Sequence, residues 1–449
     1  MRRIFIISLA CLGMMVSVVW AGSSITSPNH ATQQGFVPTS TYLPIPSDFT
    51  YTFDTVQMTA DPIVYDDQTV DGFTFTDFTY TTRYPLGLDF TVKITPPPDF
   101  TEDIVSVSLM YRFAAGSQGR ARAQEIDDGR WQAVPYDTRG LAPWMTMDVV
   151  WRVAYGETGV AETTPVHVQY IDPTRTWSRI ESEDVIVYWY DFPDEFGEVL
   201  ADAFVSVRDR FIQGFGDLLP FKPTVIIFPP GDAMGEFQAG GQINPRTTGQ
   251  ANGETYSAVL RVRGLEIEDI RTECIWNEPR DLEWQMRYAA SVATHEVAHL
   301  YQYAYGSRGP AWWIEGEATF FELEMGPVDE RLRHLVTVLD QDLATLQGQG
   351  PSGQVGTPAL DGCTHLGYDM GASFINWLVT THGGYATHLK IVELTAANTI
   401  LDQAIERATG VPFSELEYQW RQYLGLTTEA YVPPTLGYQP PPSPTPFGQ

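Results

Sequence analysis

The stretch His295-Glu296-Val297-Ala298-His299 combines the residue types and the spacing that one kind of chemistry requires. On an α-helix, residues i and i+4 lie about one turn apart on the same face, so both imidazoles can reach one metal ion. Glu296 stands beside them, where a carboxylate can take a proton from a water molecule. The stretch therefore predicts a metal site with its own general base, and a chance match on an ordinary helix is the alternative.

The flanking sequence predicts the helix independently of the motif. Apolar residues recur at steps of three and four, which is typical of a helix with one buried face. They are Leu282, Met286, Ala290, Ala293, Val297, Leu300 and Ala304. Gly306 and Pro310 are the expected stop signals.

A second helix is expected over 310–322, and it brings Glu315 into register after a short turn. Catalytic zinc uses three protein ligands and keeps one position open, and His295, His299 and Glu315 make that count. Neither Cys274 nor Cys363 has a CxxC partner, so a cysteine-ligated zinc is not indicated.

The two segments together resemble the gluzincin group of zinc metallopeptidases, whose pattern is HExxH followed by a W-x-x-E-G-x-A helix with the third ligand. Four residues match the second part: Trp312, Glu315, Gly316 and Ala318. The interval between the motifs is a few residues shorter than in the aminopeptidase branch, and a G-x-M-E-N stretch is missing. The chain is therefore most similar to the peptidase-MA-like families of secreted bacterial proteins, over roughly Asp184 to Leu426.

Composition favours export into an aqueous phase. The chain has 449 residues, with 56 acidic against 27 basic residues and a formal charge of -29. Such a field repels nucleic acid and anionic membranes, so neither is an expected partner. The resemblance to zinc metallopeptidases implies a peptide or protein substrate instead.

The two ends of the chain are expected to lie outside any folded domain. Residues 1–21 have the basic start, apolar run and small-residue exit of a secretory signal, with an uncleaved membrane anchor as the alternative. Residues 22–46 are predicted to form a flexible leader, and 427–449 a Pro-rich extended tail. In an oxidising compartment, the isolated pair Cys274 and Cys363 is expected to form a disulfide bond and not to remain as two free thiols.

The fold class expected is multidomain. Residues 47–172 show period-two alternation, as in Val105, Val107, Leu109, Tyr111 and Phe113, which predicts an antiparallel β-sandwich of immunoglobulin or fibronectin type as an accessory domain.

An α+β gluzincin-like metallopeptidase domain is expected over 180–426, ending in a helical lobe. Its predicted elements are strands at 185–190, 224–228 and 258–262 and a helix over 196–215. The strand at 258–262 is proposed as the sheet edge that lines the substrate cleft, because an edge strand can hold a peptide by backbone pairing.

Several further residues are weighed for the site. Tyr368 is a candidate oxyanion donor, with core packing as the alternative. Glu322 can orient a ligand histidine or remain a solvated charge. His365 is a competing donor interpreted as an exposed loop residue, and Glu317 and Glu324 are interpreted as surface charge.

The function expected is a secreted zinc peptidase, of endopeptidase type, that hydrolyses peptide bonds with Glu296 as general base. Two alternatives stay open. One is an inactive cell-surface or extracellular binding protein on a peptidase scaffold, and the other is an aminopeptidase, which needs an acidic anchor for the substrate amine.

Overall fold

The computed structural model describes residues 52–56, 61–114, 116–136, 140–238, 240–244, 247–265, 281–349, 359–361 and 364–427. The predicted signal, leader and Pro-rich tail lie outside these ranges, as do Cys274 and Cys363 of the predicted disulfide. Those expectations stay predictions.

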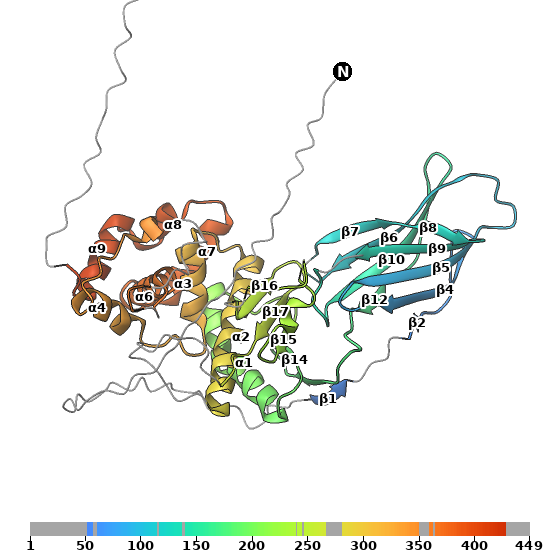
Figure 1. Cartoon of the computed structure of the whole chain (residues 1–449). Helices are drawn as coiled ribbons and strands as arrows, with labels where there is room; N and C mark the ends of the chain where they lie inside the picture. Colours follow the sequence, from blue (N-terminus) through green and yellow to red (C-terminus); the bar gives the residue numbers. More distant parts are fainter. Residues whose placement is uncertain are drawn as a thin grey trace, which may run out of the picture.

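A mixed β-sheet occupies the middle of the molecule (Figure 1). β14 pairs in parallel with β15, and β15 with β17, while the other neighbours are antiparallel. In spatial order the strands are β1 (Thr52–Val56), β13 (Trp177–Glu181), β14 (Ile186–Trp189), β15 (Thr224–Phe228), β17 (Ser257–Arg261) and β16 (Gly249–Asn252). β1 falls in the range expected for the sandwich, yet it pairs with β13 of this sheet.

Two antiparallel sheets precede the mixed sheet in the chain, in the range expected for a sandwich. One contains β11 (Gly159–Glu162), β10 (Thr146–Tyr155), β6 (Ile104–Phe113), β7 (Gln118–Arg122) and β12 (Val166–Gln169). The other contains β2 (Ile63–Val64), β3 (Gln68–Val70), β4 (Phe73–Thr82), β5 (Leu88–Thr95), β9 (Arg130–Tyr136) and β8 (Gln124–Asp127). They share one core, in which Phe78 meets Trp151 edge-on at 6.2 Å. The antiparallel sandwich is confirmed, and its immunoglobulin or fibronectin type stays a prediction.

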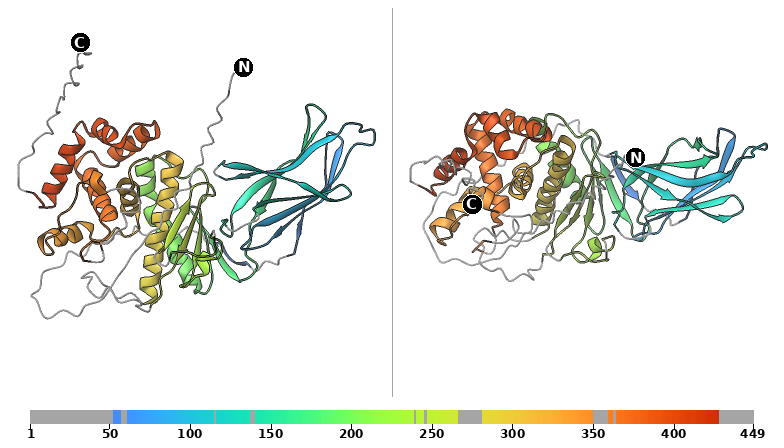
Figure 2. Two further views of the ribbon diagram at one scale, coloured as in Figure 1. Left: turned by 45° about the horizontal axis from the view of Figure 1, so that its top comes forward. Right: turned by 90° about the horizontal axis from the view of Figure 1, so that it is seen from above.

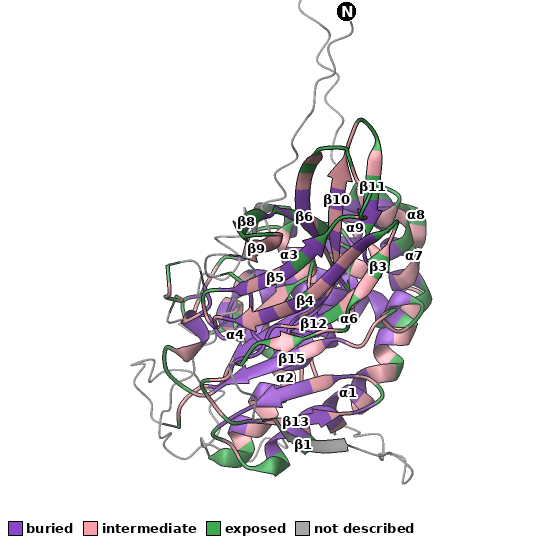
Figure 3. Ribbon diagram, turned by 90° about the vertical axis from the view of Figure 1, so that its right-hand side faces the viewer, coloured by how far each residue is buried: buried purple, intermediate pink, exposed green. Residues whose placement is uncertain are grey.

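The parallel strands of the mixed sheet are apolar at nearly every position because both of their faces are buried. On β14, Val187 and Trp189 pack against the helices, whereas Tyr188 and the following Tyr190 pack into the sandwich core. Figure 3 shows the resulting buried run along β15. The sandwich is therefore joined to the rest of the molecule through a continuous apolar core.

The helices lie on the face of the mixed sheet that points away from the sandwich (Figure 2). α1 and α2 cover the sheet, and the later helices form the lobe beyond them (Figure 1). Their bounds are α1 Asp194–Phe215, α2 Leu282–Tyr305, α3 Ala311–Phe321, α4 Val328–Thr337, α6 Leu366–Thr381, α7 Tyr385–Ala396, α8 Leu401–Thr409 and α9 Phe413–Tyr423. Among the described residues, no helix combines the length and apolar character that crossing a membrane requires.

The prediction that the strand at 258–262 forms an edge of the sheet is wrong. β17 lies inside the sheet between β15 and β16, and the edge is β16. Periodicity shows which residues form strands but not their order, because the order depends on pairings with distant segments. The edge strand beside β17 is therefore β16.

Helices α3 and α6 cross with their backbones nearly in contact. A Cβ on Gly316 would lie 2.4 Å from Gly371 Cα, and a Cβ on Gly371 would lie 2.1 Å from the Trp312 carbonyl oxygen. Only glycine permits this approach. The crossing places the first turn of α6, which carries Tyr368, close to Glu315 of α3.

Candidate metal centre

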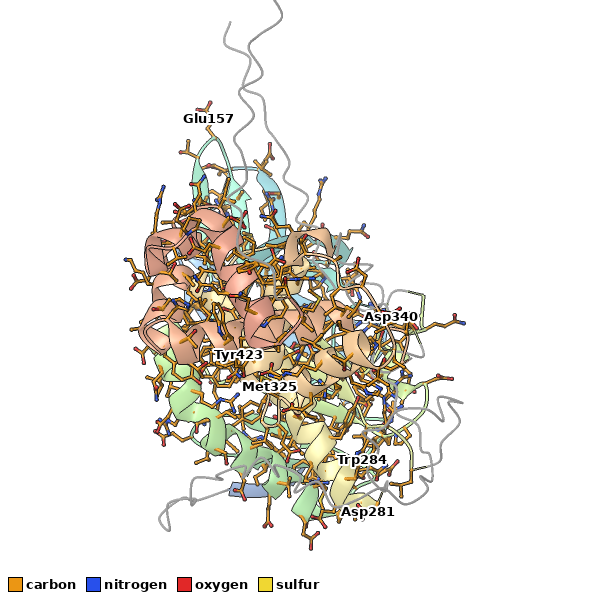
Figure 4. All side chains as sticks on the ribbon, turned by 90° about the vertical axis from the view of Figure 1, so that its left-hand side faces the viewer. Glu157, Asp281, Trp284, Met325, Asp340 and Tyr423 are labelled. Carbon is orange, nitrogen blue, oxygen red and sulfur yellow. The ribbon has the colours of Figure 1, made fainter. Side chains whose placement is uncertain are left out.

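The two histidines lie on α2, a helix with defined ends. The Asp281 carboxylate accepts a hydrogen bond from Trp284 N at 2.8 Å and caps the N-terminus, where both residues are visible in Figure 4. Gly306, at φ 74°, ends the helix and donates its N–H to the Gln302 carbonyl. The predicted helix and its stop at Gly306 are thus present.

The structure brings His295, His299 and Glu315 together. Glu315 Oε2 lies 3.5 Å from His295 Nε2 and 3.6 Å from His299 Nε2, and all three side chains are buried. Two ligand atoms about 2.1 Å from a tetrahedral zinc ion lie about 3.4 Å apart, so the spacing suits Zn²⁺. Within the described residues, this is the cluster of histidine and carboxylate groups that can hold a metal ion.

The hydrogen bonding of these atoms is the direct test of fit. His295 Nε2, His299 Nε2 and Glu315 Oε2 are buried and form no hydrogen bond of ordinary geometry with the described residues. Buried polar atoms are normally paired, and a metal ion is a partner that satisfies all three at once. The nitrogen and oxygen donors, their number and their convergence therefore fit Zn²⁺.

The three groups strongly perturb one another. Burial alone would lower the pKa of His295, but Glu315 and Glu322 raise it to about 10. Burial alone would raise the pKa of Glu315, but the two histidines lower it to about 2. The pKa of His299 is also raised by Glu315, against the effect of burial. Without a metal ion, the cluster therefore holds protons that a cation must displace.

Glu296 is completely buried beside the cluster, and neither carboxylate oxygen forms a hydrogen bond within the described residues. Burial raises the pKa of Glu296 to about 7, with the two histidines acting in the opposite direction. The side chain lies against β16, since a Cβ on Gly249 would be 2.2 Å from Glu296 Oε1. Glycine at 249 thus allows the edge strand to approach the expected general base.

Glu322 contacts the first histidine, which is one of the two interpretations that the sequence left open. Its Oε1 accepts a hydrogen bond from His295 Nδ1 at 2.8 Å, which leaves Nε2 of the ring facing Glu315. Ser291 donates to the second oxygen of Glu322 at 3.2 Å, and Arg210 donates to the Glu322 carbonyl at 2.8 Å. The carboxylate is therefore held from α2, and the backbone of Glu322 is held from α1.

Gln302 plays the corresponding part for the second histidine. Its Oε1 lies 2.8 Å from His299 Nδ1, and its Nε2 donates to the Ile314 carbonyl at 2.7 Å. Neither sequence motif includes Gln302, so the sequence alone does not identify it as a site residue. Its spacing of three from His299 on a helix was the available signal.

Tyr368 lies next to the cluster, and His365 lies next to Tyr368. The Tyr368 ring is stacked 6.0 Å from that of His295, and burial together with Glu315 raises the pKa of its hydroxyl well above 10. Asp369, the next residue, accepts two hydrogen bonds from Arg331, at 2.7 and 2.9 Å. The interpretation of His365 as exposed is wrong, because it is 3% exposed and its ring lies 6.0 Å from that of Tyr368.

The interpretation of Glu317 as surface charge is also wrong. It is fully buried, with Oε1 2.7 Å from His388 Nε2 and Oε2 accepting from Ser307 at 2.8 Å. His388 Nδ1 donates to the Gly214 carbonyl at 2.9 Å. The helical pattern of α3 could not show this, because the helix is enclosed by neighbours on both faces.

No protein-family profile and no curated protein matches this sequence. Solved structures with a similar course of the chain include an M1 zinc metallopeptidase from Deinococcus radiodurans, 10% identical, covering 85% of this chain and 94% of that one, with a TM-score of 0.30. A mutant form of that enzyme has a TM-score of 0.31 at the same identity and coverage. Yeast LTA4 hydrolase in complex with bestatin is 8% identical, covers 80% and 64%, and has a TM-score of 0.21. At TM-scores this low, we base the function on the geometry of the site.

Proposed function

We propose that this chain is a zinc-dependent peptidase, of endopeptidase type, with His295, His299 and Glu315 as metal ligands and Glu296 as general base. The observation that carries the proposal is the convergence of three buried ligand atoms beside a buried carboxylate with a pKa of about 7. Within the described residues, none of the three atoms forms a hydrogen bond of ordinary geometry. Zn²⁺ bound there supplies an activated water molecule and polarises the scissile carbonyl group. A pKa near neutrality suits a group that first accepts a proton and then returns it.

The remaining groups have separate tasks in this proposal. Glu296 takes a proton from the attacking water and passes it to the leaving amine as the C–N bond breaks. Tyr368, whose hydroxyl keeps its proton to high pH, donates a hydrogen bond to the oxyanion of the tetrahedral intermediate. Glu322 holds the His295 ring in the tautomer that presents Nε2.

The edge strand β16 is the proposed surface for the substrate backbone. It lies at the sheet edge against Glu296, and an edge strand can pair with an extended peptide without reading its sequence. Residues 249–252 read Gly-Gln-Ala-Asn and include no carboxylate. In this proposal the strand holds the substrate through its backbone, which suits an endopeptidase. Comparing hydrolysis of one peptide with a blocked and with a free N-terminus tests this against an aminopeptidase.

The peptidase-MA-like resemblance and export from the cell are part of the proposal. They rest on the W-x-x-E-G-x-A match and on the composition of the chain. An inactive binding protein would also hold zinc, but it would not require Glu296.

The deciding experiment compares wild type with Glu296→Gln. Both proteins are expected to bind one zinc ion, whereas hydrolysis of an unstructured protein by the variant falls about 10²–10⁴-fold, the usual contribution of a general base. Wild-type protein that holds zinc and cleaves no substrate, with the variant indistinguishable from it, would support the binding protein instead.

A further inference from the structure

Gln302 connects the helix that carries both histidines to the helix that carries Glu315. It lies on α2 one turn after His299, and it is almost completely buried. One end of its amide meets the His299 ring and the other meets the backbone of α3 at Ile314. Ile314 is the residue immediately before Glu315.

The orientation of the amide follows from its partners. A backbone carbonyl only accepts hydrogen bonds, so the group that faces the Ile314 oxygen at 2.7 Å must be the NH₂ of Gln302. The amide oxygen then faces His299 Nδ1 at 2.8 Å, and an oxygen without hydrogen requires a proton on that nitrogen. Nδ1 of His299 is therefore the donor, and the lone pair of the neutral ring is on Nε2, the atom 3.6 Å from Glu315.

We propose that Gln302 is a positioning residue that couples two of the three metal ligands. Its oxygen selects the metal-binding tautomer of His299, and its NH₂ fixes the α3 backbone one residue ahead of Glu315. This inference rests on the proposed zinc site but not on peptide hydrolysis. Groups that hold the distal nitrogen of a metal-bound histidine typically change metal affinity 10–100-fold when they are removed, on the order of the effect expected here.

The chain supplies a matched control on the same helix. Gln285 of α2 is also buried, and its Nε2 donates to the Arg263 carbonyl at 2.6 Å. That hydrogen bond reaches neither histidine. Gln285→Leu and Gln302→Leu therefore remove the same kind of amide-to-carbonyl bond, but only the second removes a partner of a ligand histidine.

The experiment measures zinc affinity of the metal-free proteins by competition with a chromophoric chelator, with thermal unfolding of each metal-free protein alongside. Gln302→Leu is expected to bind zinc about 10–100-fold more weakly than wild type, while Gln285→Leu keeps wild-type affinity. Equal zinc affinity in Gln302→Leu, Gln285→Leu and wild type would overturn the inference. A wild-type protein that binds no zinc would instead contradict the proposed site itself.

Gln302→Glu separates the two ends of the amide and guards against a loss of folding. It keeps an oxygen for His299 Nδ1 but sets a second oxygen against the Ile314 carbonyl. If the link to α3 matters, this near-isosteric variant also binds zinc more weakly, and its cobalt-substituted form has an altered visible spectrum. Wild-type affinity and spectrum in Gln302→Glu would contradict the coupling.

Discussion

Glu315 and Glu317 are two residues apart on α3, and both are buried against histidine, yet their surroundings differ. Glu317 is fully paired: His388 meets one oxygen at 2.7 Å and Ser307 meets the other at 2.8 Å. Glu315 faces two imidazole nitrogens at 3.5 and 3.6 Å, and neither its Oε2 nor either nitrogen forms a hydrogen bond of ordinary geometry within the described residues. Residue type and burial are the same, so it is the unpaired, converging atoms that indicate a metal ion.

The largest effect is expected on zinc affinity when Glu315 is replaced. Glu315→Leu removes a direct ligand, so zinc affinity should fall by well over the roughly 100-fold that marks loss of an outer partner. Chelator competition measures this, with Glu317→Gln as the control that keeps wild-type affinity. A Glu315→Leu protein that still binds zinc as tightly as wild type would contradict the difference between Glu315 as a metal ligand and Glu317 as a structural carboxylate.

On the Glu317 side, the expected effect is on folding. Glu317→Leu leaves His388 buried without its partner, and breaking a buried pair in this way costs about 3–5 kcal/mol in the free energy of unfolding. Glu317→Gln should stay close to wild type, because its amide can accept from Ser307 and donate to His388 Nε2. Denaturant unfolding of both metal-free variants is the measurement. Equal stability of Glu317→Leu and wild type would refute a structural role for this network.

A substitution at Tyr368 tests whether the proposed zinc site catalyses hydrolysis as well as binding the metal ion. Tyr368→Phe removes the proposed oxyanion donor while keeping the ring against His295, so kcat should fall about 10²–10³-fold with zinc content unchanged. Steady-state kinetics with a metal assay checks both quantities. A change confined to KM would indicate that the hydroxyl positions substrate and does not stabilise the oxyanion.

The smallest effect is a pH dependence of zinc binding. In the metal-free protein the pKa of His295 is about 10, so at neutral pH zinc must displace its proton. Affinity should therefore rise with pH, by about tenfold per pH unit for each proton displaced between pH 6 and 8. Glu317→Gln should have the same slope, because Glu317 lies outside the cluster. An affinity independent of pH would contradict the protonated cluster.

Much of this site could be predicted from the sequence because its parts are local. The approach of His295 and His299 depends only on the geometry of one helix, and Glu315 lies on the next helix in the chain. The strand at Thr224–Phe228 matches its predicted bounds because both of its faces are buried, which produces an uninterrupted apolar run.

The failures concern contacts between distant segments. β17 could not be recognised as an inner strand because its outer neighbour β16 lies in a Gly- and Asn-rich stretch whose sequence does not indicate a strand. Glu317 could not be recognised as buried because its partner His388 is 71 residues away. The burial of His365 and the contact of Gln302 with Ile314 could not be predicted for the same reason, because both arise only when α2, α3 and α6 pack together.

The most direct test of the central claim is a crystal structure of the zinc-loaded protein with anomalous data collected on both sides of the zinc absorption edge. We expect one zinc peak on the Glu315 side of α3, about 2.0–2.2 Å from His295 Nε2, His299 Nε2 and a Glu315 oxygen, with none beside Glu317. A peak that is not shared by these three atoms, or zinc bound at Glu317 and His388, would contradict it.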